Sequence, residues 1–237
     1  MTSTAVTWHE VENGSYDADL WLWRELAEAA DGPILDLGAG AGRVAADLAS
    51  RGHEVVALDA DAELLAVLEE RAPGTVTVEA DARRFHLERS FVLAIAPMQL
   101  AQILGGPAGR AAMLERVHAH LMPGGTFAAA LTDLREVILD DTASPPLPDV
   151  LEREGWVFSS QPVSLTADDD GLVVERRRQA VSPEGEIEEE LTAIAFDYVS
   201  AARFEAEARE AGLEPVGRRE IAETLDHFGS TVVLCRR

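Results

Sequence analysis

Short apolar runs alternate with longer amphipathic segments through the first half of the chain. The run Phe91–Ala96 holds no polar residue, as expected for a strand that is buried on both faces. The predicted strands span residues 34–37, 54–58, 75–79, 91–96 and 126–131. The predicted helices span residues 17–30, 43–51 and 61–71, and a further helix ends near His118 and His120. Strands that alternate with helices at this spacing predict a doubly wound, mainly parallel sheet with right-handed crossovers.

The pattern changes in the second half of the chain. Residues 140–149 are rich in proline and acidic side chains and predict a loop. Antiparallel strands are then predicted at residues 156–165, 172–181 and 186–198. The turn between the last two would place Arg178 opposite Glu189 and Arg177 opposite Glu190, and opposite charges in register favour such a hairpin. Regular order returns with a helix at residues 201–211 and strands at residues 215–219 and 231–236.

Composition excludes several classes of function. The net charge is −23 and all 20 basic residues are arginines, so the surface repels phosphate backbones and nucleic acid is not an expected partner. Without lysine the chain has no Schiff-base chemistry and no lysine-dependent phosphate loop. The single cysteine, Cys235, excludes an internal disulfide and a thiolate-rich zinc site. No group of His, Asp and Glu has metal-ligand spacing, so no metal is expected.

Targeting signals are not evident in the sequence. No basic N-terminal start is followed by an apolar stretch, so no signal peptide is expected. No apolar run approaches the ~20 residues that span a bilayer, so no membrane partner is expected. With the lone cysteine, which fits a reducing compartment, these features predict a cytoplasmic protein.

A glycine-rich turn follows the first strand. It reads Asp36-x-Gly38-x-Gly40-x-Gly42 and opens the next helix. Glycine lets the backbone turn sharply and approach a ligand closely, because no Cβ atom intervenes. The helix that follows presents free backbone N–H groups toward the same place. A turn of this type holds a nucleoside-bearing cofactor at the carboxyl ends of the strands.

The turn alone fits two classes of cofactor. Residues 40–45 also match the looser nicotinamide-binding pattern, in which Asp59, at the end of the second strand, would bind a ribose. Three features favour a cofactor without a pyrophosphate. A carboxylate at Asp36 suits an ammonium group and would repel a pyrophosphate. Asp81 ends the third strand and offers an acceptor to an amine such as adenine N6, and the chain is too short for the usual separate substrate domain of a dehydrogenase.

In combination, these features resemble the class I S-adenosylmethionine-dependent methyltransferases. The ordered set consists of residues 36–42, Asp59, Ala80–Ala82 and Pro123–Gly125, and the matching segment runs from about residue 32 to residue 131. The resemblance implies S-adenosyl-L-methionine as the cofactor. It also implies a Rossmann-like, doubly wound, seven-stranded sheet, mostly parallel with an antiparallel last strand, and a small antiparallel β insertion.

The resemblance implies which residues hold the cofactor. Asp36 would face the methionyl amino group, Asp59 would accept from both ribose hydroxyls, and Asp81 would accept from adenine N6. The glycines of the turn would lie against the methionine and ribose portions. The full set implied is Tyr16, Asp36, Gly38, Ala39, Gly40, Gly42, Asp59, Ala60, Leu64, Asp81, Ala82, Ala96, Pro97 and Met98.

Further members of this set would complete the site. Ala60 and Leu64 would flank the adenine, and the Ala82 backbone N–H would reach a ring nitrogen. Residues 96–98, just past the fourth strand, would sit near the sulfonium and the acceptor. Tyr16 precedes the first predicted helix, where similar methyltransferases close a lid over the cofactor carboxylate.

With the resemblance, the chain divides into four segments. An N-terminal lid segment is followed by the cofactor-binding core, by an antiparallel insertion that would cover the cofactor, and by the completion of the core sheet. Their expected bounds are residues 1–16, 17–140, 141–199 and 200–237.

Methyl transfer from a sulfonium is an in-line displacement in which the cofactor supplies the reactivity. The protein mainly aligns the nucleophile and excludes water, so no obligate catalytic residue is expected. A general base is needed only if the acceptor arrives protonated, and the candidates are Tyr16, Gln99 and His227. His118 and His120 are expected to be structural, as cations at the negative end of a helix dipole.

The antiparallel insertion is the segment expected to define the acceptor. Its hydrophobic positions either line an organic-substrate pocket or form a small core of their own. These positions are Val157, Phe158, Val163, Leu165, Ile194 and Phe196. The insertion is also a candidate homodimer contact. The sequence therefore predicts N- or O-methylation of a small organic acceptor; the alternatives are a protein that binds the cofactor without turnover, and an enzyme for another reaction of the cofactor such as cyclisation.

Overall fold

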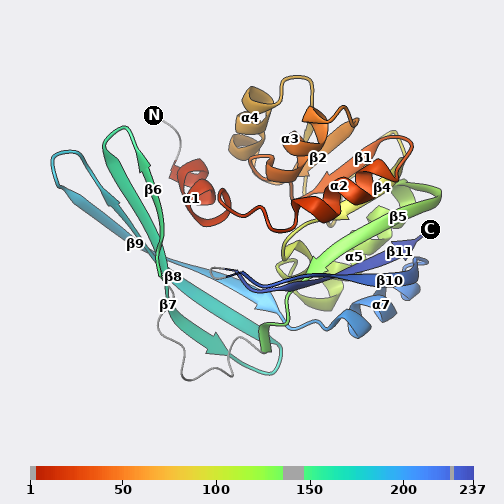
Figure 1. Cartoon of the computed structure of the whole chain (residues 1–237). Coiled ribbons are helices and arrows are strands. Elements are labelled where there is room, and N and C mark those ends of the chain that lie inside the picture. Colours follow the sequence, from red (N-terminus) through yellow and green to blue (C-terminus); the bar gives the residue numbers. More distant parts are fainter. Residues whose placement is uncertain (1–3, 136–146, 225–226) are drawn as a thin grey trace.

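The computed structural model describes residues 4–135, 147–224 and 227–237, and it contains two sheets (Figure 1). The larger has seven strands in the order β10-β11-β5-β4-β1-β2-β3, and the smaller has four in the order β6-β7-β8-β9. The predicted loop at 140–149 falls largely outside the described residues. No helix in the described part of the chain is long and apolar enough to cross a membrane.

The seven-stranded sheet confirms the predicted Rossmann-like fold. Neighbours among β1 to β5 run parallel, whereas β11 is antiparallel to both β5 and β10. The strands are β1 (Ile34–Leu37), β2 (Val55–Asp59), β3 (Val76–Glu79), β4 (Phe91–Ala96), β5 (Leu121–Leu131), β10 (Glu214–Ile221) and β11 (Ser230–Arg236). All residues of β1 are buried, because the strand lies in the middle of the sheet between two helical layers.

Helices cover both faces of this sheet. The helices are α1 (Thr4–Asn13), α2 (Leu20–Glu28), α3 (Arg43–Ser50), α4 (Ala62–Arg71), α5 (Gly106–His120) and α7 (Ala201–Glu210), with a 3-10 turn η1 (Leu100–Gln102) after β4. One layer is formed by α2, α3 and α4, whose Trp23, Leu48 and Leu68 are fully buried. The other is formed by α5 and α7, where Phe204 packs beside Phe127 of β5.

The insertion is an antiparallel sheet of four strands, one more than predicted. They are β6 (Asp149–Arg153), β7 (Trp156–Ala167), β8 (Gly171–Val181) and β9 (Ile187–Asp197). The first strand was missed because its sequence lies at the end of the proline-rich stretch.

The register predicted for the hairpin β8–β9 is wrong by one residue. Arg178 lies opposite Glu190, not Glu189, and Arg177 lies opposite Leu191. The loop holds five residues, because the Ser182 N–H donates to the Glu186 carbonyl at 2.8 Å. The Ser182 hydroxyl accepts from the Glu186 N–H at 3.1 Å and stabilises this longer loop.

One face of the insertion packs on α1, the helix that leads the chain into the core (Figure 1). Trp8 and Val11 of α1 are buried against Ala180, with Trp156 and Phe158 beside them. The rings of Trp8 and Phe158 meet edge to face, with centroids 5.7 Å apart. Phe158 therefore belongs to a small core shared by the insertion and α1.

A buried ion pair holds the end of the insertion to the core. The Arg110 guanidinium of α5 donates to Glu207 of α7 at 2.7 and 3.1 Å and to Asp197, the last residue of β9, at 3.2 Å. Burial alone would raise the pKa of Glu207, but hydrogen bonds from Arg110 and Arg203 outweigh it and hold that pKa below its ordinary value. Breaking a buried pair of this kind leaves an uncompensated charge, so separating the end of β9 from α5 and α7 is costly.

Candidate functional site

The turn between β1 and α3 depends on left-handed backbone at alternate residues. The φ angle is 67° at Gly38, 54° at Gly40 and 87° at Gly42. Other residues are strained in this region of backbone space. Gly42 also has no room for a side chain, since a Cβ atom there would lie 2.2 Å from Leu68 Cδ1 of α4. The turn therefore requires these glycines whether or not a ligand is bound.

Asp59, the last residue of β2, holds the turn against the neighbouring strand. One carboxylate oxygen accepts from the Gly40 N–H at 2.8 Å and the other accepts from the Asp61 N–H at 2.9 Å. The Gly38 N–H donates to the Leu58 carbonyl at 2.8 Å. Each carboxylate oxygen of Asp59 keeps a further lone pair for another donor.

Asp36 is a buried carboxylate without a hydrogen-bond partner. Its residue is 1% exposed, and neither carboxylate oxygen has a partner with hydrogen-bond geometry among the described residues, although the Ala45 backbone N–H lies close enough to lower its pKa slightly. Burial raises the pKa of Asp36 to about 7; the Asp59 charge adds to the rise and the Arg43 charge opposes it. An unpaired buried carboxylate is costly in a folded protein, so this position favours a cationic partner.

Asp81 follows β3 and is already paired. The Arg83 guanidinium donates to it at 2.7 and 2.9 Å, and the Arg83 backbone N–H donates at 2.8 Å. These hydrogen bonds from Arg83 lower the pKa of Asp81 to about 2. Because β1, β2 and β3 are parallel neighbours, Asp36, Asp59 and Asp81 belong to one end of the sheet, as expected.

The remaining residues expected at the cofactor lie around the same end of the sheet. Leu64 of α4 is buried against Val6 of α1 and Ala41. Ala60 directly follows β2 and is exposed, and Ala82 is buried. Ala39 is buried within the turn.

The segment after β4 also reaches this end of the sheet. Ala96 ends β4 and is fully buried, and Pro97 is buried beside it. Met98 has φ of 54°, an uncommon conformation for a residue with a side chain. Strain of this kind is typical of functional segments.

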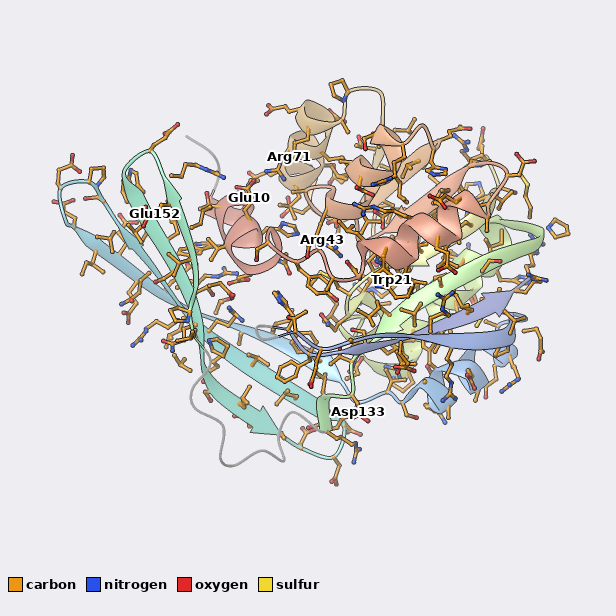
Figure 2. All side chains as sticks on the ribbon, viewed as in Figure 1. Glu10, Trp21, Arg43, Arg71, Asp133 and Glu152 are labelled. Atoms are coloured by element: carbon orange, nitrogen blue, oxygen red, sulfur yellow. The ribbon has the colours of Figure 1, made fainter. Side chains whose placement is uncertain are left out.

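Tyr16 and His227, distant in the sequence, lie together. Their ring centroids are 4.7 Å apart, and the Arg43 guanidinium lies 5.0 Å from the Tyr16 ring centroid. Arg43 (labelled in Figure 2) is fixed by Asp19 at 2.5 and 2.8 Å. Burial raises the pKa of Tyr16 to about 12. A phenol with this pKa stays protonated at neutral pH, so Tyr16 is a poor general base.

Gln99 lies after β4, and its side-chain NH2 donates to Thr132 Oγ1 at 3.0 Å. The neighbouring Gln102 was missed from the sequence. Its buried amide accepts from the Thr132 N–H at 2.8 Å and donates to the Thr132 carbonyl at 3.0 Å and the Asp197 carbonyl at 3.3 Å. Gln102 thus joins the ends of β5 and β9, and no local sequence pattern marks such a long-range role.

His120 is structural, but not as the expected cation. The Leu87 N–H donates to its Nε2 at 2.9 Å, which leaves Nδ1 to donate to the Arg116 carbonyl at 2.6 Å. One nitrogen that accepts and one that donates define a neutral ring. The helix-dipole reading of His120 is therefore wrong, since the ring is held by two neutral hydrogen bonds.

The N-terminal segment contains a helix that sequence reasoning missed. Residues 4–13 form α1, and His9 on this helix lies against Gly40 of the turn. Glu10 pairs with Arg71 of α4 and with Arg153 of β6. Figure 2 shows Glu10 on α1 beside Arg71. Among the described residues no group of three or more His, Cys, Asp or Glu side chains could hold a metal ion.

Comparison with known protein families finds one match, and the matched residues include the glycine turn. Residues 34–125 match the family described as Methyltransferase domain. No curated protein sequence matches the chain at a significant level.

Solved structures share the fold at low identity. The chain is similar to the sugar N-methyltransferase KedS8 from Streptoalloteichus, with a TM-score of 0.79, 18% identity, and 100% of this chain and 94% of that chain covered. It is similar to CalS10, an amino pentose methyltransferase from Micromonospora echinaspora, with a TM-score of 0.71, 19% identity, and coverage of 100% and 98%. For the glycopeptide N-methyltransferase MtfA the TM-score is 0.62, the identity 21%, and the coverage 91% and 86%.

These matches agree with the geometry of the turn and with the order of the seven strands. The family match spans the segment from β1 to β5, where the three strand-end carboxylates lie. The structural matches extend over the insertion as well. The chain therefore contains an S-adenosylmethionine-dependent methyltransferase domain, and its fold is that of the solved methyltransferases named above.

Proposed function

We propose that this methyltransferase acts on a small organic molecule, by N- or O-methylation, with an amine nitrogen favoured as the attacking atom. The observation that carries the proposal, on the side of the methyl donor, is the buried carboxylate of Asp36 beside the glycine turn. This carboxylate fits a cationic amino-acid group such as that of S-adenosylmethionine. The similar structures named for sugar and glycopeptide N-methyltransferases support nitrogen. An insertion that packs beside the cofactor-binding end of the sheet supports a small acceptor.

The donor side of the proposed site uses residues already in place. Asp36 meets the methionyl ammonium, and the free lone pairs of Asp59 accept from the ribose hydroxyls. Gly38 is exposed and offers bare backbone to the methionine portion. Asp81 already accepts hydrogen bonds from Arg83, so it can accept from adenine N6 only with a carboxylate that also binds Arg83. This differs from the sequence-based prediction, in which Asp81 was free to accept from adenine N6. When bound, the cofactor supplies an electrophilic methyl group.

The acceptor side of the proposed site lies near Tyr16 and His227. A protonated amine must lose a proton before its lone pair can attack, and we assign His227 as the group that takes that proton. Asp149 belongs to the same surroundings. Burial raises its pKa, while the charges of Arg176 and His227 oppose that rise. The Tyr16 ring lies against the His227 imidazole at a tilt of 37°, and in this proposal it orients the imidazole.

Turnover should depend on a small amine. Incubation of the protein with S-adenosylmethionine and a panel of amino sugars, simple amines and phenols should release S-adenosylhomocysteine in the presence of at least one amine. The methyl group can pass only to a nucleophile whose free lone pair lies in line with the sulfonium. Mass spectrometry of the acceptor checks that one methyl group was added. Cofactor binding with no acceptor-dependent release across the panel would contradict the proposal, as would consumption of the cofactor with no acceptor present.

Replacement of Asp59 should weaken cofactor binding. Asp59→Ala removes two charge-assisted acceptors for the ribose, so the binding free energy should fall by ~1–3 kcal/mol in a calorimetric titration. Asp47→Ala is the control, because Asp47 pairs with Arg24 and Arg51 on the outer side of α3 and touches no part of the turn. Unchanged binding by a folded Asp59→Ala protein would show that the ribose lies elsewhere.

Asp36 should give the stability of the protein a distinctive pH dependence. Its pKa is raised from 3.8 in the unfolded chain to about 7 in the folded protein, so the folded protein holds this proton more tightly. The free energy of unfolding that this adds is fully present below pH 4 and is lost as the pH rises through about 7. Relative to Asp36→Asn, the wild type should lose about 2–3 kcal/mol of unfolding free energy between pH 5 and pH 8. Urea unfolding of both proteins at the two pH values measures this difference.

The same substitution separates the stability effect from binding. An ammonium partner favours the ionised carboxylate, so S-adenosylmethionine should bind the wild type more weakly as the pH falls below about 7. Asp36→Asn should bind weakly at every pH. Parallel stability profiles for wild type and Asp36→Asn would show that this carboxylate does not titrate in the range given.

The second proposal concerns the outer face of the insertion, which we infer to be a homodimer contact. On the face away from α1, the strands expose apolar side chains to solvent, with polar side chains between some of them. These are Val150, Val157, Val173, Ile187 and Leu191, of which the last two are each 66% exposed. The edge strand β9 carries Glu188–Glu190, whose charges disfavour edge-to-edge pairing. A second copy packed face to face, related by a twofold axis, fits both features.

Charges on this face should abolish the dimer. The wild type should elute as a dimer in size exclusion with light scattering at tens of micromolar, and Ile187→Asp with Leu191→Asp should elute as a monomer, because burying two carboxylates without partners is costly. Val216→Asp is the control, since Val216 is 51% exposed on β10 of the other sheet. A monomeric wild type would refute the contact.

A further inference from the structure

The open side of Gly40 is covered by the imidazole ring of His9. A Cβ atom at Gly40 would lie 2.4 Å from His9 Nε2 and 2.9 Å from His9 Cε1, so the ring rests directly on the glycine backbone. A Cβ atom at Gly38 would instead meet Leu100, and one at Gly42 would meet Leu68. Gly40 is thus the glycine of this turn that faces a polar side chain from α1.

The position of His9 is set by α1, which is wedged between the core and the insertion. Toward the insertion, Glu12 accepts from Arg178 at 2.8 and 2.9 Å and from the Ser160 hydroxyl at 2.7 Å. The Arg178 guanidinium also lies 5.4 Å from the Trp8 ring centroid.

On its other side, α1 contacts the core. Val6 packs against Ala41 and Leu64, and Glu10 pairs with Arg71 (Figure 2). A small shift of α1 toward the insertion would lift His9 from Gly40 while leaving the Glu12 contacts in place.

The ring of His9 is poorly satisfied where it lies. Its Nδ1 is buried and has no hydrogen-bond partner among the described residues. Burial lowers the pKa of His9 and Arg71 adds to this, while the carboxylates of Asp59, Glu12 and Asp61 act in the opposite direction. A buried ring nitrogen without a partner weakens the hold of the ring on this surface, so the ring can be displaced.

We propose that His9 and S-adenosylmethionine compete for the same surface of Gly40, so that His9 sets the affinity for the cofactor. The inference rests on the proposed role of the glycine turn. A ligand that uses the close approach that glycine permits needs the volume that the imidazole fills. Binding must therefore move the ring, and α1 with it, away from the turn. The measured affinity is then reduced by the fraction of molecules in which the ring still covers Gly40.

Removing the ring should strengthen binding. In calorimetric titration with S-adenosylmethionine, His9→Ala should lower the dissociation constant by about tenfold, as expected if the ring covers Gly40 in most molecules. Glu10→Gln, which breaks the ion pairs to Arg71 and Arg153, should act in the same direction through α1. Stopped-flow mixing should show a faster association rate for both variants.

Two variants at the opposite end of the sheet serve as controls. His53→Ala removes an imidazole just before β2, and Glu54→Gln removes a carboxylate that pairs with Arg89. Both should bind like the wild type. Thermal melting followed by circular dichroism identifies variants that fail to fold, and Glu10→Gln tests the proposal if His9→Ala does not fold.

The outcomes separate this inference from the proposed cofactor site. Binding by the wild type with equal or weaker binding by folded His9→Ala and Glu10→Gln overturns the competition and makes His9 part of the cofactor's own surroundings. Binding by His9→Ala that exceeds binding by the wild type supports it. No binding by any of these proteins at millimolar cofactor overturns the proposed site and the competition together.

Discussion

The hydrogen bond between the Gly40 N–H and the Asp59 carboxylate is the contact on which the functional end of the molecule depends. It joins a turn of left-handed glycines to the end of β2, and through Asp61 to the start of α4. Without it the turn has no side-chain partner from the neighbouring strand. The same carboxylate is the proposed ribose ligand, so the residue that shapes the turn also faces the ligand that the turn holds.

The constraint at this turn extends to the N-terminus. Because Gly40 has no side chain, the imidazole of His9 can rest on its backbone and α1 can approach the core. The other side of α1 then meets β6, β7 and β8, through Trp8, Glu10 and Glu12. One helix thus contacts the proposed methyl-donor site and the insertion that is expected to define the acceptor. Movement of α1 would therefore change the contacts at the proposed methyl-donor site and at the insertion.

The sequence predicts the core better than it predicts what covers the core. The alternation of apolar runs and amphipathic segments predicts all seven strands. The central strands β1 and β4 give the clearest signal, because strands buried between two helical layers must be almost continuously apolar, whereas the edge strands β3 and β10 are largely exposed. The spacing of Asp36, Asp59 and Asp81 predicts that they share one end of the sheet, which follows from parallel topology. It does not predict that Arg83 binds Asp81, since both residues could equally face solvent in an exposed loop.

Helix α1 was missed for a physical reason. A helix that buries one face shows apolar residues at a spacing of three and four, whereas α1 is buried on two sides. Val6 faces the core, and Trp8 and Val11 face the insertion, so its apolar positions form no single stripe. The hairpin register was missed for a different reason. Charge pairing alone does not fix the length of a loop, and the hydroxyl of Ser182 draws Glu186 into it.

The strong acidity of the chain acts differently near α1 and at long range. Close to α1 the carboxylates are neutralised, because Glu10 lies between Arg71 and Arg153 and Glu12 contacts Arg178. Arginine suits this use, since its planar fork can bind more than one oxygen at once. At long range the net charge of −23 attracts cations and so favours a protonated amine over a phosphorylated molecule as the acceptor. For the proposed reaction that attraction brings in the protonated amine, which must lose a proton before it can attack, and His227 is the acceptor that we propose for this proton.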